Sequence, residues 1–323
     1  MTLLPTLAAV GIAIATTAAP SPPGESGTFK VFLLAGQSNM EGQAVVDLDH
    51  VEHYNGGRGT LARLGQDPRT SSKLAHLRNE DGSWASRDDV FCWYKPANGD
   101  LKAGPLSIGF AVYPGQHHFG PELQIGHILG DAFVEPVLLI KTAWGGKSLH
   151  VDFRPPSAGG AVGPFYRRML EEYAEGLRDA RRRFPSLEGL EPDLEGVIWF
   201  QGWNDMFVDG GIDAYPLNLV HLTADLRRHF GNPGLAIVVG ETGNAGDDRF
   251  RTQQRTGTEL IPPPSAFVPT RSFLRKPEDS PNQGHGHHWF GNAESYFLIG
   301  DALGHAMLRL VEPMLEPKVK PSP

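Results

Sequence analysis

The chain has 323 residues, of which 40% are apolar, and its formal net charge at pH 7 is −8. This length allows one large domain or two small ones, with a sizeable core. The acidic balance and the lack of a long basic run argue against nucleic acid as a partner, because phosphate binding needs clustered Lys and Arg. The single cysteine, Cys92, can form no intrachain disulfide and is expected to be a half-buried apolar thiol.

Residues 1–19 are predicted to be a signal peptide. The stretch from Leu3 to Ala19 is apolar or small, and a linker rich in Pro, Ser and Gly follows at 20–27. We therefore expect a secreted or periplasmic protein with no stable membrane insertion after the signal is removed. An uncleaved membrane anchor is the alternative, since no Lys or Arg precedes the apolar stretch.

Strand and helix patterns alternate along the rest of the chain. Unbroken apolar runs, each ending at Gly and polar residues, predict buried parallel strands at 28–36, 133–146, 194–202 and 234–243. Apolar residues three and four apart predict helices at 120–133, 164–184, 213–230 and 292–311. This alternation indicates an α/β protein, a three-layer α/β/α sandwich with a short parallel sheet.

One stretch, 43–119, does not follow this alternation. It is rich in Asp, Gly, Asn, His and aromatic residues, and we expect a loop-rich insertion with short strands or turns above the carboxyl edge of the sheet. The domain organisation expected is a single domain at 28–315, which contains this insertion, and a tail at 316–323.

The carboxyl ends of parallel strands meet at one edge of the sheet, where ligands bind. Ser38 follows the first predicted strand and could act as a nucleophile there. Amide hydrogens could hold an oxyanion: the backbone N–H of Ser38, the backbone N–H of Gly146 and the side chain of Asn204. Each also has a plainer interpretation, since Ser38 could cap a helix and the other two could belong to turns.

A base for Ser38 is expected late in the chain. Three histidines, His285, His287 and His288, precede the last predicted helix, and this loop could reach the edge of the sheet. The same cluster could bind zinc or nickel, although such sites usually recruit a carboxylate or Cys as well. The "GxSxG" motif of lipase-type hydrolases is absent around Ser38.

Four blocks in this order resemble the SGNH hydrolases, in particular the branch of sialate O-acetylesterases and carbohydrate esterase family 6, which includes acetylxylan esterases. They are "GQSNM" at 36–40, "AWGGKSL" at 143–149, "WFQGWND" at 199–205 and "GHHWFGNAESYFLIGDAL" at 286–303. The resemblance covers about residues 28–311. It implies a flavodoxin-like fold and a serine esterase that removes O-acetyl groups from a carbohydrate, with no metal or organic cofactor.

The resemblance also implies roles for individual residues. Ser38 would be the nucleophile and His288 the base, with His287 as its rival. Gly146 and Asn204 would complete the oxyanion hole with the N–H of Ser38. The supporting residues would be Gln37, Asn39 and Gln201.

The chain departs from this family in one respect. Many members carry Asp three residues before the catalytic His, and here that position holds His285, or Gly284 if His287 is the base. Asp279, Glu241 or Glu294 could orient the imidazole instead, as could a backbone carbonyl.

Several aromatic residues lie near the four blocks and could stack on a sugar or simply fill the core: Trp93, Tyr94, Trp144, Trp203 and Trp289. Three polar residues could also line the cleft: His117, His118 and Asp152. Two further functions remain open, a non-catalytic carbohydrate-binding protein on the same scaffold and a hydrolase of lipid esters or thioesters. The polar, aromatic composition of 43–119 favours a sugar over an acyl chain.

Overall fold

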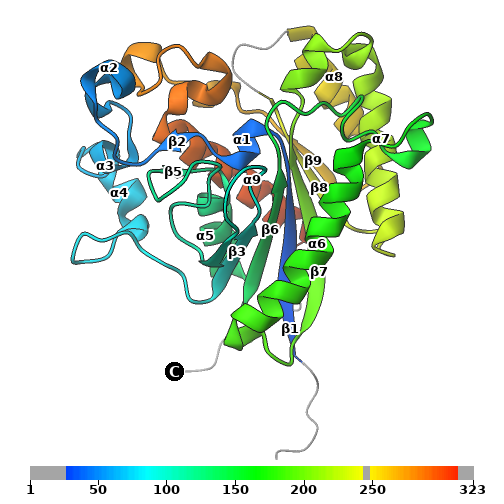
Figure 1. Ribbon diagram of the computed structural model, residues 1–323, viewed down its shortest axis with the longest axis horizontal. Helices are drawn as coiled ribbons and strands as arrows, with labels where there is room; N and C mark the ends of the chain where they lie inside the picture. The colour runs from blue at the N-terminus through cyan, green and yellow to red at the C-terminus, as the bar shows by residue number, and fades with distance from the viewer. Residues whose placement is uncertain (1–26, 243–247, 312–323) are drawn as a thin grey trace, which may run out of the picture.

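The computed structural model of the protein describes residues 27–242 and 248–311 (Figure 1). The predicted signal peptide, almost all of the linker, residues 312–315 and the tail lie outside these ranges. Within the described ranges, no helix is both long and apolar enough to cross a membrane.

A seven-stranded sheet forms the middle layer of the domain, in the order β4-β3-β6-β1-β7-β8-β9 (Figure 1). All neighbouring strands are parallel except β3 and β4. The strands are β1 (Thr28–Gly36), β3 (Val90–Tyr94), β4 (Lys102–Pro105), β6 (Val137–Ala143), β7 (Glu191–Phe200), β8 (Ala236–Gly240) and β9 (Ser265–Val268).

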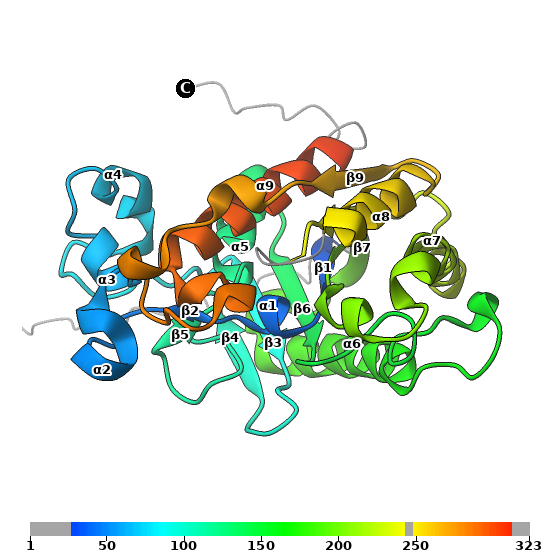
Figure 2. The same ribbon diagram turned by 90° about the horizontal axis from the view of Figure 1, so that it is seen from above.

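Helices cover both faces of the sheet, which confirms the predicted three-layer α/β/α architecture (Figure 2). Successive side chains of β1 point to opposite faces, so that Phe32 and Leu34 enter one core while Val31 and Leu33 enter the other. The first core is covered by α5 (Glu122–Ala132) and α9 (Ala293–Val311). The second is covered by α6 (Pro164–Arg183), α7 (Gly211–His229) and α8 (Asp248–Glu259).

The expectation of a loop-rich insertion at 43–119 is partly wrong. The segment contributes β3 to the main sheet, where it pairs in parallel with β6, and it adds β4 at the edge. Cys92 lies in β3 and is fully buried rather than half-buried, and burial raises the pKa of its thiol. The rest of the segment holds the short elements β2 (Ala44–Val45), α2 (Val51–Tyr54), α3 (Leu61–Leu64), α4 (Ser71–Leu74) and β5 (His118–Phe119).

The carboxyl ends of the parallel strands β1, β6 and β7 lie at the upper edge of the sheet in Figure 1. Three short segments follow there and carry the predicted site residues. They are α1 (Ser38–Glu41) after β1, the loop after β6 that contains Gly146, and the 3-10 helix η5 (Trp203–Phe207) after β7. Of the residues predicted to end the fourth strand, Gly243 and Asn244 lie outside the described residues.

Candidate active site

Ser38 lies two residues beyond Gly36, the last residue of β1, where the neighbouring strand leaves room only for glycine. A side-chain carbon at Gly36 would approach the carbonyl oxygen of Phe200 to 2.3 Å. The close contact of β1 with β7 therefore depends on this glycine. After Gln37 the chain turns into α1, and Ser38 is its first residue and half-buried.

His288 approaches Ser38 from the 3-10 segment η8 (Gly286–Gly291), and its Nε2 lies 3.0 Å from the Ser38 Oγ. His287 makes no hydrogen bond to Ser38, so of the two rival bases only His288 is in position. The two residues that follow His288 are Trp289 and Phe290. Their φ angles are 53° and 55°, a region that residues with bulky side chains rarely adopt. Trp289 is fully buried, so this unusual backbone conformation lies within the packed core.

Asn39 ties the serine turn to the histidine segment. Its Nδ2 donates to the carbonyl oxygen of His287 at 3.0 Å, and its Oδ1 accepts from the hydroxyl of Tyr296 at 2.6 Å. Tyr296 lies on α9, so the first and last parts of the domain meet at this side chain. Asn39 therefore supports the position of His288.

The three predicted oxyanion donors share one property. Within the described residues, the backbone N–H groups of Ser38 and Gly146 and the Nδ2 of Asn204 donate to no acceptor of the chain. Asn204 accepts from the Gln37 Nε2 at 3.1 Å through its Oδ1, which directs its own N–H groups away from Gln37. Gly146 has a φ of 73°, which favours glycine, and its neighbour Gly145 lies beside Ser38.

A buried polar network joins the loops that carry these donors. The Gln37 Oε1 accepts from the backbone N–H of Gly202 at 3.0 Å. The Gln201 Nε2 donates to the carbonyl oxygen of Lys147 at 2.8 Å and to the Asp205 Oδ2 at 2.7 Å. Gln37 and Gln201 thus hold the loops after β1, β6 and β7 in a fixed relation.

Asp205 completes this network, a role that the sequence analysis did not assign. Its carboxylate accepts from the backbone N–H groups of Leu149 and His150 at 2.9 and 2.8 Å, just beyond Gly146. Burial raises the pKa of Asp205 to about 6, and the hydrogen bonds from Gln201, Leu149 and His150 limit the rise. These hydrogen bonds offset the cost of burying the carboxylate, and no sequence pattern reveals that Asp205 is buried.

Glu41 is a second buried acid beside the site that the sequence analysis did not identify. Its carboxyl group accepts from the Tyr94 hydroxyl at 3.3 Å, and a side-chain carbon at Gly145 would lie 3.1 Å from its Oε2. Burial raises the pKa of Glu41 to about 7, although Lys141, Tyr94 and the Gly145 backbone oppose the rise. Lys141 itself is fully buried and pairs with Glu122 at 2.8 Å.

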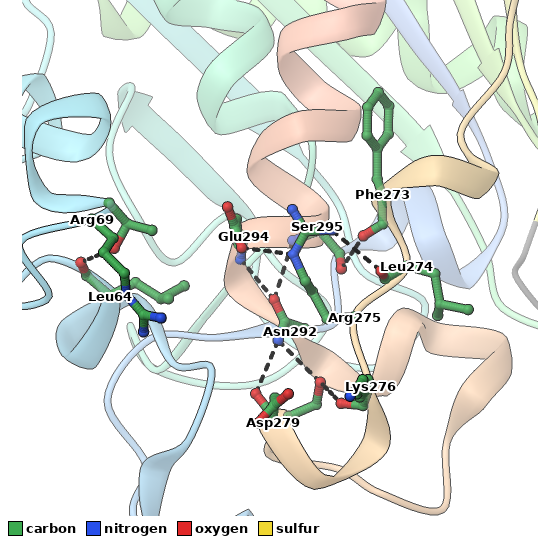
Figure 3. A network of polar contacts seen from close by, with 12 residues as sticks. Leu64, Arg69, Phe273, Leu274, Arg275, Lys276, Asp279, Asn292, Glu294 and Ser295 are labelled. Carbon is green, nitrogen blue, oxygen red and sulfur yellow. Dashed lines mark hydrogen bonds and ion pairs between the residues drawn. The ribbon is translucent and has the colours of Figure 1, made fainter.

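None of the three acids proposed to orient the imidazole reaches His288. Glu294 pairs with Arg275 at 2.7 Å, and the backbone oxygen of Asp279 accepts from Asn292, as Figure 3 shows. Glu241 accepts from the backbone N–H groups of Thr270 and Arg271. Among the described residues, no carboxylate is hydrogen-bonded to His288. Burial, together with the neighbouring His287 and His285, lowers the pKa of His288 to about 3. The imidazole is therefore neutral at pH 7.

Most of the aromatic residues expected to flank a sugar are core residues. Trp93, Tyr94, Trp144 and Trp289 are all buried, and only Trp203 is partly exposed. Phe207, in the same 3-10 helix as Trp203, is also an exposed aromatic residue near the site. The sequence analysis did not identify it, because an isolated Phe belongs to no motif.

The three polar residues expected to line the cleft have other partners. His117 pairs with Asp47 at 2.7 Å, and His118 is buried against the ring of Tyr113. Asp152 accepts from the backbone N–H of Ser148 at 2.8 Å, so it braces the loop after Gly146. Across the described parts of the chain, no group of His, Cys, Asp and Glu could hold a metal ion.

Comparisons with solved structures agree with the fold. A solved structure of an Arabidopsis thaliana protein is 16% identical, covers 87% of this chain and 98% of its own, and has a TM-score of 0.57. NanS is 15% identical, with coverage of 90% and 99% and a TM-score of 0.55. A carbohydrate acetylesterase from Xanthomonas citri is 15% identical, with coverage of 88% and 56% and a TM-score of 0.51. At these identities the likeness shows the fold alone.

No curated protein matches the chain. A protein-family model does match, over residues 28–309, which include every residue of the site described above. The family is described as carbohydrate esterase, sialic acid-specific acetylesterase. The expected resemblance is thereby confirmed, and the chain belongs to this family of carbohydrate esterases.

Proposed function

We propose that the protein is a serine esterase that removes O-acetyl groups from a carbohydrate through an acetyl-enzyme intermediate. The observation that carries the proposal is the 3.0 Å contact of the His288 Nε2 with the Ser38 Oγ, beside three N–H donors that have no partner in the described chain. This is the arrangement that acyl transfer from an ester needs. Membership of a carbohydrate esterase family supports a sugar ester as the substrate.

In the first half of the reaction, the Ser38 Oγ attacks the acetyl carbonyl carbon while the His288 Nε2 takes its proton. The carbonyl oxygen becomes an oxyanion, which the N–H groups of Ser38, Gly146 and Asn204 stabilise. The bond from this carbon to the sugar oxygen then breaks, and His288 returns the proton to that oxygen. Water repeats the sequence on the acetyl-enzyme, which releases acetate and restores Ser38.

The electrostatics of His288 suit a base that starts neutral. Its pKa, lowered to about 3, leaves the imidazole free to accept the Ser38 proton at neutral and mildly acid pH. Since none of the described carboxylates is hydrogen-bonded to it, the imidazolium that forms draws its stabilisation from the adjacent oxyanion. We therefore expect kcat/KM to stay level as the pH falls through 6.5, where an ordinary histidine would become charged.

Acetate release tests the proposal directly. Wild-type protein is incubated with acetylated xylan, acetylated pectin, an O-acetylated sialic acid and p-nitrophenyl acetate, beside Ser38→Ala and a sample treated with a serine-reactive organophosphonate. We expect release by the wild type only, with unchanged thermal unfolding of Ser38→Ala. Sugar binding without acetate release would make the protein a non-catalytic carbohydrate-binding protein. A marked preference for long acyl chains would make it a lipid or thioester hydrolase.

A further inference from the structure

Three rings extend from the catalytic imidazole in an unbroken series, and we call them the aromatic strip: His287, Trp203 and Phe207. The centroid of the His287 ring lies 4.0 Å from that of His288. The Trp203 ring is 5.4 Å from His287, and the Phe207 ring is 5.8 Å from Trp203. The strip therefore leads from the reacting groups outward along η5.

All three rings of the strip are at least partly exposed, whereas comparable side chains elsewhere in the domain are buried. Phe207 is 71% exposed, and Trp203 and His287 are half-buried, whereas Trp93, Trp144 and Trp289 are in the core. An exposed aromatic surface that continues a catalytic site is typical of a ligand-binding surface. A phenyl ring that is 71% exposed leaves most of its apolar surface in water, so a partner that covers it would explain its position.

The His287 and Trp203 segments of the strip are both held in place beside Ser38. Trp203 precedes Asn204, whose amide is hydrogen-bonded to Gln37 at 3.1 Å. The backbone of His287 is held by Asn39 at 3.0 Å. Because Gln37 and Asn39 flank the nucleophile, a molecule that rests on the strip is placed in a set orientation toward it, and little ordering is needed on binding.

The direction of proton transfer decides which part of the ester lies here. His288 must protonate the departing sugar oxygen, so the alcohol portion of the ester lies on the His288 side of Ser38, and there the strip begins. A pyranose ring has a face of C–H bonds that can pack on an aromatic ring while its hydroxyl groups remain in water. The strip has no fixed charge, and burial lowers the pKa of His287, so it suits a neutral ring.

We propose that the aromatic strip is the subsite for the leaving sugar, with an uncharged pyranose ring stacked on Trp203 and Phe207. This inference deepens the proposed function and rests on it for the position of the scissile ester. It assigns to Phe207 a role in substrate specificity and none in the chemical steps.

Two substrates separate sugar recognition from chemistry: an O-acetylated xylo-oligosaccharide and ethyl acetate, whose alcohol is too small to reach the strip. For Phe207→Ala we expect kcat/KM on the sugar ester to fall about fivefold to tenfold, mainly through KM. On ethyl acetate it should stay within about twofold. The matched control is Leu260→Ala. Leu260 is an apolar residue that is 53% exposed, and it lies just before β9, away from the strip.

Trp203 gives a second, independent comparison. Trp203→Phe retains an aromatic face and should keep most of the activity on the sugar ester, whereas Trp203→Ala should lose it about tenfold. Ethyl acetate reports in both variants whether the neighbouring Asn204 still functions. An equal loss on both substrates, or no loss on either, for both Phe207→Ala and Trp203→Ala would overturn the subsite.

Binding tests the strip even if the proposed hydrolysis fails. In Ser38→Ala, titration with xylo-, cello- and manno-oligosaccharides should change tryptophan fluorescence. The affinity should fall about fivefold to tenfold when Phe207→Ala is added. If none of these sugars binds, or if binding is indifferent to Phe207, the inference is wrong. Absence of acetate release by the wild type, with binding intact, would instead reject the proposed esterase alone.

Discussion

Asn204 presents one amide to two different parts of the site. Its oxygen accepts from Gln37, and its N–H groups remain available for an oxyanion. For Asn204→Ala we expect kcat on acetyl esters to fall by about 10²–10³ while KM changes little, because the lost hydrogen bond forms only in the transition state. Asn98→Ala, at an exposed position in the loop after β3, is the control. Full turnover in a folded Asn204→Ala would remove this residue from the oxyanion hole.

Glu41 gives a pH signature of its own. Its pKa is raised to about 7 in the folded protein, whereas an ordinary glutamate in the unfolded chain has a pKa of about 4.5. In the folded state Glu41 therefore holds an extra proton between these two pH values. Its contribution to stability is therefore complete below pH 4.5 and is lost as the pH rises through 7. Glu41→Gln imitates the protonated form, so its free energy of unfolding relative to wild type should improve by about 1–3 kcal/mol from pH 4.5 to pH 8.

Chemical denaturation at the two pH values measures this change. The matched control is Glu52→Gln, on the exposed helix α2. The same pH dependence in wild type and Glu41→Gln would show that Glu41 is not the titrating group.

Sequence reasoning reaches different depths for different residues of the site. Ser38 and His288 follow from blocks of recognisable residues, and the structure places them in contact. Glu41 and Asp205 were missed because their importance lies in burial, which depends on how distant loops pack. Glu294, near His288 in sequence, pairs with Arg275 instead, since nearness along a chain says little about where a carboxylate points.

At the scale of elements, the junction of β1 and β7 sets the position of the nucleophile. An added methyl group at Gly36 would overlap the carbonyl oxygen of Phe200. For Gly36→Ala we expect a loss of about 1–3 kcal/mol in unfolding free energy, together with reduced kcat, because Ser38 is two residues away and must shift. Gly234→Ala, where a methyl group meets only Asn232 at 3.6 Å, should change neither quantity appreciably. Unaltered stability in Gly36→Ala would contradict the close approach of these strands.

The long elements were predictable because their signals are local. The expected helix at 164–184 is α6 at Pro164–Arg183, and the expected strand at 28–36 is β1. The edge strand β9 was missed because it has only four residues. The helix α8 was missed because its sequence, DRFRTQQRTGTE, has a single large apolar residue, Phe250. Such elements depend on the surface that receives them rather than on their own pattern.

At the scale of the whole molecule, buried histidines make the fold sensitive to acid. Burial lowers the pKa values of His118 and His127 to about 4 and that of His288 to about 3. The unfolded chain binds these protons from about pH 6.5 downward and the folded chain does not, so stability falls as the pH drops from 6.5 to 4. The raised pKa values of Glu41 and Asp205 act in the opposite direction.

His127 isolates this effect away from the candidate active site. It lies on α5, next to His76 and Arg87, which also lower its pKa. The difference in unfolding free energy between His127→Gln and wild type should shift in favour of the variant by about 1–3 kcal/mol from pH 7 to pH 4.5. Thermal unfolding at both pH values, with exposed His53→Gln as control, measures the difference. A parallel loss of stability in wild type and variant would exclude His127 as a contributor.

The bond between Asn39 and Tyr296 spans 257 positions of the chain, and the contact between Ser38 and His288 spans 250. During synthesis, the proposed nucleophile Ser38 emerges long before His288, its proposed base. A ribosome-bound fragment that ends before residue 288 would carry the proposed nucleophile without its proposed base, whatever part of the sheet has already formed. If the proposed function holds, acetate release would begin only after the segment that carries His288 has folded against Ser38.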